Sequence, residues 1–365
     1  MLALRCKLGY KARVSASLYI RPVGRIAPPA RSQEREPGLA FAVVGREDLR
    51  FAGAELIERE GSRIRRRLLS AAELVDRTGP ARLPELVQRL LEPRAPIAGL
   101  ALDRPLIMGV VNVTPDSFSD GGRFLAPEAA IAHALRLEAE GAQILDIGGE
   151  STRPGSGGVD LEEECRRVLP VIRGLAGRTQ ARLSIDTRKA EVMRRAAQAG
   201  AHLINDVSAL AHDPAAMAAA VETGLPVVLM HAQGDPRTMQ DAPRYADVVL
   251  DVYDMLSARI EACERAGIPR ARQIVDPGIG FGKTLAHNLA LLGALSIFHG
   301  LGCPNALGAT RKSFNGRLTG AAADDRLPGS LAAALLGAAQ GVQILRVHDV
   351  AATRQALAVW EGSLQ

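Results

Sequence analysis

The 365-residue chain has few cysteines, few aromatic residues and no long apolar run. Its four cysteines, Cys6, Cys165, Cys263 and Cys303, lie far apart and form no CxxC pair. That spacing excludes a dense disulfide framework and a zinc ribbon, and it favours the reduced thiols of a cytoplasmic protein. No apolar stretch approaches the roughly 18–20 residues that cross a bilayer, so we expect no membrane span.

The charge is unevenly distributed along the chain. The net charge is +5, and the excess of Lys and Arg lies within the first 100 residues, while the remainder is slightly acidic. The basic start leaves open a transit peptide, a flexible tail or an early start codon. Neither aromatic interleaving nor a known motif accompanies the arginines, so we expect no nucleic-acid binding.

Composition divides the chain into three parts. Residues 1–36 contain three prolines and no clear period, and we expect a flexible segment there. Residues 37–100 form an accessory module with helices near 70–77 and 83–91. The remainder, 104–362, has a different texture and is predicted to be the catalytic domain.

Short apolar runs alternate with helical stretches rich in Ala and Leu throughout that domain. The eight runs lie at 106–111, 143–147, 182–185, 202–204, 226–230, 273–275, 305–308 and 343–347. Strand–helix alternation predicts a parallel sheet, and eight units in this length favour an α/β fold of the (β/α)8 TIM-barrel type. A doubly wound open sheet is the alternative, but the Gly-rich dinucleotide fingerprint that often accompanies it is absent.

Polar residues stand at or just after the carboxyl end of every predicted strand. They are Asn112, Asp146, Asp186, Asn205 with Asp206, His231, Asp276, Thr310 to Ser313, and Arg346 with His348 and Asp349. A single buried Asp is most often a structural group. Polar residues at all eight strand ends instead predict one catalytic face, because these ends converge in a barrel.

Three of these residues suit a flat heterocycle. The carboxylates of Asp186 and Asp276 can accept from an amino–imino edge, and the amide of Asn205 can both donate and accept. Lys312 adds a donor, and Arg346 could lie against the ring face.

A second group suits a phosphate-bearing substrate. Arg153, Arg346 and His348 can contact phosphate oxygens, and the carbonyl of Asn112 can help to hold Mg²⁺. The glycines and lysine of 278–283 lack the spacing of a P-loop. No Ser-His-Asp or Cys-His nucleophile is apparent, which favours group transfer with an electrostatically stabilised leaving group.

Eight ordered motifs resemble one family, the dihydropteroate synthases of the folate pathway. They cover about two-thirds of the chain and exclude the N-terminal part. The motifs are NVTPDSFSDGG (112–122), DIGGESTRPGS (146–156), SIDTRKAEV (184–192), INDVSA (204–209), LMHAQGDPRTMQ (229–240), DPGIGFGK (276–283), TRKSF (310–314) and RVHDV (346–350). The resemblance implies a transferase that condenses 6-hydroxymethyl-7,8-dihydropterin diphosphate with 4-aminobenzoate, giving 7,8-dihydropteroate and diphosphate.

The resemblance also implies roles for individual residues, with Asp186, Lys312 and Arg346 as the catalytic ones. The pterin would be held by Asp186, Asn205, Met230, Asp276, Gly308, Lys312 and Arg346. The diphosphate would lie on Asn112, Arg346 and His348, with Mg²⁺ on Asn112. The aminobenzoate pocket, where sulfonamides would compete, would be formed by Thr152, Arg153, Pro154, Phe281 and Ser313.

The implied mechanism is dissociative: diphosphate leaves first and the aniline nitrogen then attacks. We expect loops 113–126 and 151–159 to close over the diphosphate and to create the aminobenzoate site. The family often forms dimers, which implies a homodimer. Two alternatives are a pterin-dependent methyltransferase domain and a non-catalytic pterin-binding paralogue.

Overall fold

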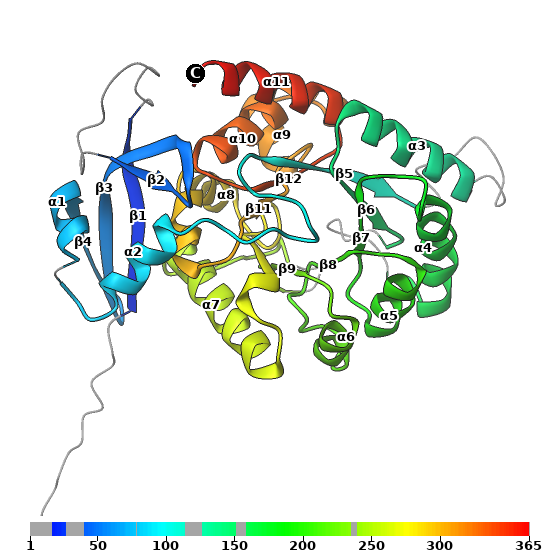
Figure 1. Cartoon of the computed structure of the whole chain (residues 1–365), viewed down its shortest axis with the longest axis horizontal. Coiled ribbons are helices and arrows are strands. Elements are labelled where there is room, and N and C mark those ends of the chain that lie inside the picture. Colours follow the sequence, from blue (N-terminus) through cyan, green and yellow to red (C-terminus); the bar gives the residue numbers. More distant parts are fainter. Residues whose placement is uncertain are drawn as a thin grey trace, which may run out of the picture.

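The computed structural model describes residues 17–26, 40–77, 79–113, 126–150, 158–234 and 239–364. Within these ranges, an eight-stranded parallel sheet surrounded by helices is preceded in the chain by a smaller four-stranded sheet with two helices (Figure 1). Among the described residues, no helix is both long and apolar enough to cross a membrane.

The smaller unit, residues 17–91, is called the accessory module, and its strands form the accessory sheet. The strands are β1 (Ser17–Ile26), β2 (Phe41–Val43), β3 (Arg46–Glu60) and β4 (Arg63–Ser70). The central strand β3 pairs antiparallel with β1 on one side and with β2 and β4 on the other. Helices α1 (Ala71–Asp76) and α2 (Leu83–Leu91) confirm the two predicted helices and bury leucines against the sheet.

Strand β1 corrects the prediction that residues 1–36 form a flexible segment, since Ser17–Ile26 is a ten-residue strand. Leu18 and Ile20 face the core of the accessory module, and Tyr19 faces the barrel. Pro22 obscures this alternation in the sequence, but an edge strand tolerates proline. Residues 1–16 and 27–36 lie outside the described part of the chain.

The larger sheet confirms the predicted TIM barrel. Its strands are β5 (Leu106–Asn112), β6 (Ile144–Gly148), β7 (Arg182–Asp186), β8 (Leu203–Asp206), β9 (Val227–Met230), β10 (Gln273–Asp276), β11 (Ala306–Leu307) and β12 (Ile344–Val347). The seven pairings between neighbouring strands are all parallel, in the order β10-β9-β8-β7-β6-β5-β12-β11. A single parallel bridge between Val275 and Asn305 closes the ring between β10 and β11.

Helices cover the outside of this sheet (Figure 1). They are α3 (Ala126–Glu140), α4 (Leu161–Leu175), α5 (Ala190–Ala199), α6 (Ala216–Thr223), α7 (Val248–Ala266), α8 (Leu285–Leu292), α10 (Leu327–Ala339) and α11 (Val350–Gly362). Helix α8 is short, because the chain turns at Gly293 and continues as the 3-10 helix η3 (Leu295–Leu301). Helix α9 (Ser313–Thr319) follows β11 and the turn at Lys312.

Side chains alternate between the two faces of each strand, and this determines which residues point into the barrel. An apolar layer inside the barrel contains Ile144, Leu203, Val228, Ile274, Ala306 and Ile344. Side chains two residues further along a strand point to the same face. Each of these six strands therefore directs one further residue inward, above the apolar layer, at its carboxyl end.

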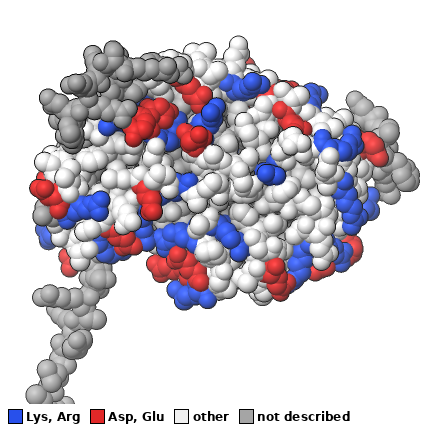
Figure 2. Space-filling view, viewed as in Figure 1, with Lys and Arg blue, Asp and Glu red and all other residues white. Residues whose placement is uncertain are grey.

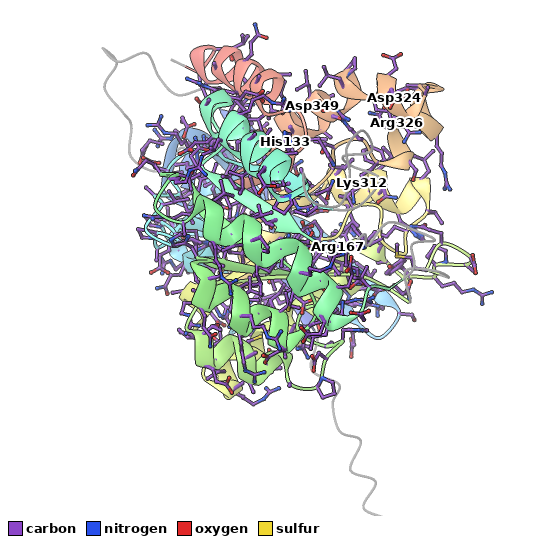
Figure 3. All side chains as sticks on the ribbon, turned by 90° about the vertical axis from the view of Figure 1, so that its right-hand side faces the viewer. His133, Arg167, Lys312, Asp324, Arg326 and Asp349 are labelled. Atoms are coloured by element: carbon purple, nitrogen blue, oxygen red, sulfur yellow. The ribbon has the colours of Figure 1, made fainter. Side chains whose placement is uncertain are left out.

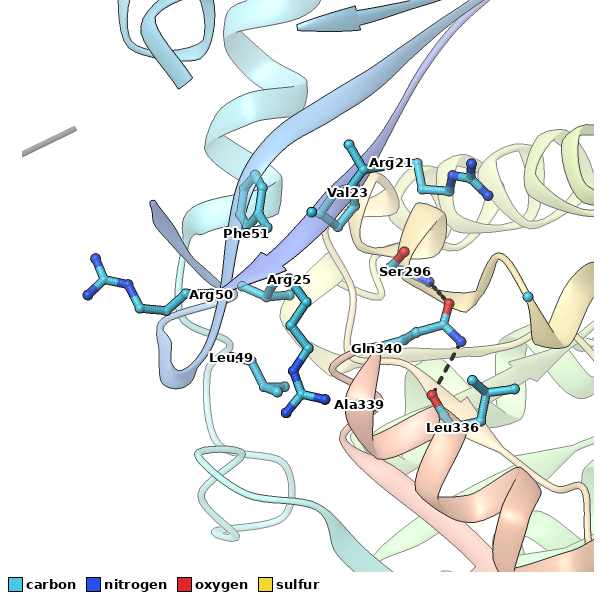
Figure 4. A pocket seen from close by; sticks show the side chains of 14 residues that line it. Arg21, Val23, Arg25, Leu49, Arg50, Phe51, Ser296, Leu336, Ala339 and Gln340 are labelled. Carbon is cyan, nitrogen blue, oxygen red and sulfur yellow. Dashed lines mark hydrogen bonds between the residues drawn. The ribbon is translucent and has the colours of Figure 1, made fainter. Parts of the chain in front are cut away.

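The accessory module packs against α7, η3 and the end of α10. Tyr19 and Ile57 belong to the same buried cluster as the barrel residues. Towards the other end of β1, a pocket of about 350 Å³ separates the two units, with Val23 and Phe51 on one side and Leu336 on the other (Figure 4). On the face seen in Figure 2, basic and acidic side chains are interspersed over the described residues.

Candidate active site

The residues that follow the apolar layer include most of the predicted site. Asp146, Asn205, Met230, Asp276, Gly308 and Arg346 each stand two positions beyond a residue of that layer. Asp186 ends the intervening strand β7, and Asn112 ends β5. The barrel thus gathers side chains from strands that are far apart in sequence.

A network of hydrogen bonds centres on Asp146, which is completely buried. Asp146 Oδ1 accepts from Ser184 Oγ at 2.6 Å. Its Oδ2 accepts from Arg346 Nε at 2.6 Å and from Asn205 Nδ2 at 3.0 Å. Arg346 Nη2 donates to Asp186 Oδ2 at 2.7 Å. We call Asp146, Asp186, Asn205 and Arg346 the central cluster.

The pKa values of Arg346 and Asp186 depend on the charges around them. Burial opposes the charge of Arg346, but the carboxylates of Asp146 and Asp186 outweigh that effect and raise the pKa of the guanidinium. Burial raises the pKa of Asp186 above its ordinary value, Arg346 opposes this shift, and the like charge of Asp146 adds to it. Arg346 is therefore firmly cationic and orients Asp186.

Asp276 ends β10, which the closing bridge places beside β11 and two strands from Arg346 on β12. Burial raises the pKa of its carboxyl, while the amide of Gly278 and the charge of Lys312 oppose the shift. Gly278 N donates to Asp276 Oδ1 at 2.7 Å. A Cβ on Gly308 would lie 3.8 Å from both Asp276 Oδ2 and the Cβ of Arg346, so glycine keeps the space between these side chains open.

The loop after β10, residues 276–283, is held in shape by glycines and by a buried lysine. Gly278, Gly280 and Gly282 all have positive φ, and a Cβ on Gly278 would lie only 1.9 Å from the carbonyl oxygen of His231. Lys283, 1% exposed, donates to the carbonyl oxygens of Gly278 and Phe281, both at 2.9 Å. These contacts give this lysine a structural role in place of the phosphate contact of a P-loop.

The Lys283 ammonium also lies 2.9 Å from His231 Nδ1. Burial lowers the pKa of Lys283 to about 7, although Asp276 opposes that shift. Burial and the neighbouring Lys283 lower the pKa of His231 to about 3, so the imidazole is neutral. His231 follows β9 and serves the loop rather than the interior of the barrel.

Phe281 and Lys312 meet at the edge of this loop. The Lys312 ammonium lies 4.0 Å from the centre of the Phe281 ring, a cation–π distance. Lys312 immediately precedes α9, and Ser313 is the first residue of that helix.

Asn112 and His348 line a hollow together with Arg311 and Asp349, next to residues of α3 and the start of α11. Thr310 Oγ1 lies 2.9 Å from His348 Nδ1, and Arg311 Nε donates to Asp349 Oδ2 at 3.0 Å. His133 of α3 also lines this hollow, and Figure 3 labels it and Asp349.

Three predicted residues, Thr152, Arg153 and Pro154, lie outside the described residues, as do most of loops 113–126 and 151–159. The predicted closure of these loops stays a prediction. No group of three or more His, Cys, Asp or Glu side chains that could hold a metal ion occurs within the described ranges.

Alternate residues of each strand face the interior of the barrel, and this alternation distinguishes site residues from polar residues that only stabilise the fold. Asp206 faces away from the interior and accepts from the amides of Ser208 and Leu210. Asp146 has the inward parity of Asn205, yet it was predicted only as a polar strand end and was given no role. Its position two residues after Ile144 was the signal that could have assigned it.

Comparisons with known proteins agree with this geometry. A family model described as pterin binding enzyme matches residues 108–348, which leaves the accessory module outside. The chain is 49% identical over 265 residues to dihydropteroate synthase of Escherichia coli strain K12, covering 73% of this chain and 94% of that protein.

Two solved structures resemble this one. Xanthomonas albilineans dihydropteroate synthase with 4-aminobenzoic acid is 54% identical, with a TM-score of 0.69, and covers 73% of this chain and 96% of that chain. The same enzyme in complex with 7,8-dihydropteroate is 51% identical, with a TM-score of 0.66, over 72% and 95% of the two chains.

Proposed function

We propose how individual residues act in a chain that belongs to the pterin-binding enzyme family and, within it, to the dihydropteroate synthases. The enzyme condenses 6-hydroxymethyl-7,8-dihydropterin diphosphate with 4-aminobenzoate in folate biosynthesis. The observation that carries the proposed roles is the central cluster, in which one partly buried arginine orients two carboxylates inside the barrel.

In this proposal the pterin enters between Asp186 and Asp276. Their carboxylates and the amide of Asn205 match the donor and acceptor edge of the ring. Asp146 does not touch the pterin and instead fixes the Asn205 amide, so that its oxygen faces the slot. Met230 and Gly308 form the walls, Lys312 donates to the ring, and Arg346 lies against one ring face.

Asp186 then stabilises the reaction electrostatically. Departure of diphosphate leaves positive charge on the pterin methylene and ring, and a carboxylate held beside the ring favours that charge. Arg346 contributes at the other end of the breaking C–O bond, where it and His348 face the diphosphate oxygens.

The hollow at Asn112 fits a magnesium ion in its donor chemistry. Mg²⁺ prefers oxygen ligands and retains several waters, so one carboxamide oxygen together with diphosphate oxygens satisfies it. Asn112 lies at the end of β5 on the wall of that hollow. When bound, the metal would supply positive charge to the leaving group.

4-Aminobenzoate would lie beside Phe281 and Ser313, with Thr152, Arg153 and Pro154 completing the pocket. Its aromatic amine is nucleophilic when neutral, so no protein base is needed. We expect ordered binding, because loops that close over diphosphate would form part of this pocket. Tight aminobenzoate binding in calorimetry, with neither pterin nor diphosphate present, would contradict this order.

Diphosphate release tests the reaction directly. On mixing both substrates with Mg²⁺, the enzyme should release one diphosphate for each 7,8-dihydropteroate formed, and chelation should slow this release. A methyltransferase domain or a non-catalytic paralogue would release none. Turnover that is unaffected by chelation would contradict the role of the metal while leaving the reaction in place.

We also propose a homodimer that acts in the cytoplasm. Leu289, Leu318 and Leu336, on the neighbouring helices α8, α9 and α10, are exposed and could form an apolar contact between copies. Cys165, Cys263 and Cys303 are unpaired thiols, which fits a reducing compartment. Light scattering of the wild type and of Leu336→Glu tests the dimer, which the charge should weaken.

A further inference from the structure

We infer that two arginines of the accessory sheet, Arg59 and Arg66, are positioning residues for loop 276–283, and hence for the aminobenzoate end of the site. The inference rests on the proposed role of Phe281 in the aminobenzoate pocket. It gives the accessory module, which the family model does not cover, a part in the activity of the barrel.

The first step is the contact between the accessory sheet and the start of α7. Arg59 Nη1 donates to Asp251 Oδ1 at 2.6 Å, and Arg66 Nη2 donates to Asp247 Oδ2 at 3.2 Å. Tyr19, next to Arg59 on the sheet, donates its hydroxyl to Asp254 Oδ1 at 2.8 Å. Three carboxylates in the first turns of α7 therefore meet one face of the accessory sheet.

The second step is that each of two carboxylates has a second set of partners. Asp247 Oδ1 accepts from the amides of Val249 and Leu250 at 3.0 and 3.1 Å and caps the helix. Asp251 Oδ2 accepts from the amides of Ala246 and Asp247 at 2.8 and 3.3 Å. One oxygen of each aspartate thus binds an arginine, and the other fixes the backbone of 246–250.

The third step connects this backbone to the loop. Tyr245, directly before the fixed segment, donates its hydroxyl to the carbonyl of Gly282 at 2.8 Å. Gln240 donates to the carbonyl of Gly280 at 2.7 Å. Movement at the start of α7 would therefore shift the Tyr245 contact with the glycine-rich loop, while the Gln240 contact lies further from α7 along the chain.

The fourth step concerns which part of the loop depends on these contacts. Asp276 is held by its pairing in β10 with Met230, so its position does not depend on α7. Gly280 and Gly282 flank Phe281 and have positive φ. Glycine adopts positive and negative φ about equally, so surrounding contacts must select this conformation. Lys283 holds Phe281 through its carbonyl oxygen, so loss of the Tyr245 contact should displace the Phe281 side chain more than Asp276.

The accessory module does not pack against the barrel equally tightly throughout, and Arg59 makes a close contact with α7. Around Val23 and Phe51 the pocket of Figure 4 separates the two units. A second pocket of about 340 Å³ lies beside Arg66 and Asp247, whereas Arg59 and Asp251 meet directly, with only 19% and 25% of their side chains exposed.

The double variant Arg59→Met/Arg66→Met tests the inference in the full-length enzyme, because Met retains an apolar stem without the charge. The KM for aminobenzoate should rise about three- to tenfold, with smaller changes in kcat and in the KM for the pterin substrate. Hydrogen exchange should be faster in residues 277–283 and unchanged in α5. Arg59→Lys/Arg66→Lys should restore most of the loss.

Arg65→Met is the matched control, since Arg65 is exposed on the same strand and faces the other side of the sheet. An equal effect of the double variant and the control would overturn the inference. A uniform loss in kcat and both KM values, with faster exchange throughout the barrel, would also overturn it, because it would indicate general destabilisation.

Phe281→Ala separates this inference from the proposed function. If that variant leaves the KM for aminobenzoate unchanged, the assignment of Phe281 is wrong. Hydrogen exchange of 277–283 in the double variant then decides alone whether the arginines position the loop.

Discussion

Two arginine–aspartate assemblies in this protein use the same chemical groups in different surroundings. In the barrel, Arg346 binds Asp146 and Asp186, and the Asp146 side chain has no exposed surface. At the accessory sheet, Arg66 binds Asp247 with 43% and 21% of the two side chains exposed. Because Asp146 is completely buried, removal of its charge is costly, whereas water can replace much of the contact between Arg66 and Asp247.

The difference also concerns what each assembly does. The buried charges are retained in a place where an apolar core would be easier to form, and they surround the slot in which the reaction is proposed to occur. The exposed pair instead orients a helix start. Substitution of a buried side chain in the central cluster should therefore have a larger effect than substitution of an exposed arginine of the accessory sheet.

The largest expected effect belongs to Asp186. Asp186→Ala should lower kcat by about 10²–10³-fold, because the carboxylate that stabilises the developing cation is lost. Circular dichroism should show an intact fold, and diphosphate release measures the loss. Unimpaired turnover would refute the central cluster as the catalytic site.

Asp146→Ala should have the largest effect on stability, roughly 3–5 kcal/mol in the free energy of unfolding, because the partly buried Arg346 guanidinium and the buried Asn205 amide both lose this partner. Urea unfolding measures this change. The control is Ser184→Ala, which removes one hydrogen bond to Asp146 and should cost only about 1 kcal/mol. Equal losses for the two variants would contradict the importance of the buried charge.

Asp276→Asn should reveal a pH-dependent effect of intermediate size. Burial raises the pKa of this carboxyl, so the folded chain binds its proton more tightly than the unfolded chain. Ionisation therefore destabilises the fold as pH rises from the ordinary carboxylate range through the folded pKa. The ligand-free variant should gain stability relative to the wild type over that range and then level off, while losing pterin binding.

A difference between Asp276→Asn and the wild type that is constant from acidic to alkaline pH would show that the carboxyl is not strained by burial. Thermal unfolding in a series of buffers supplies this measurement, and Asp206→Asn, on the outward face of β8, provides the comparison with an aspartate held by three local donors.

The smallest expected effect is that of Arg66→Met on stability, at most about 1 kcal/mol and weaker in high salt. Its effect on the KM for aminobenzoate should nevertheless exceed that of Arg65→Met. A stability loss as large as that of Asp146→Ala would remove the distinction between the two assemblies.

The sequence predicted the barrel well because its strands are buried and its polar residues recur at one end of each strand. Asp186, Asn205, Asp276 and Arg346 were identified in this way, and strand parity explains why Asp206 does not join them. Three physical causes limited the prediction elsewhere: proline in an edge strand obscured β1, a short helix such as α9 has little periodicity, and contacts between distant elements leave no local pattern.

The contacts of Arg59 and Arg66 illustrate the last cause. Their partners lie almost 200 residues later in the chain, and an arginine-rich strand reads as a solvated face. The role of Lys283 was not predicted either: its spacing from the glycines argued against a P-loop, but its contacts with the carbonyl oxygens of Gly278 and Phe281 leave no pattern in the sequence.

The ring of strands has a seam. β10 pairs with β9 over four residues, but it meets the β11 side through the single bridge between Val275 and Asn305. Asp276 and Gly308 stand on opposite sides of that seam, just above the bridge. A pterin that contacts both residues would add interactions between β10 and β11, which are joined by this single bridge. The bound substrate would thereby stabilise the closed barrel.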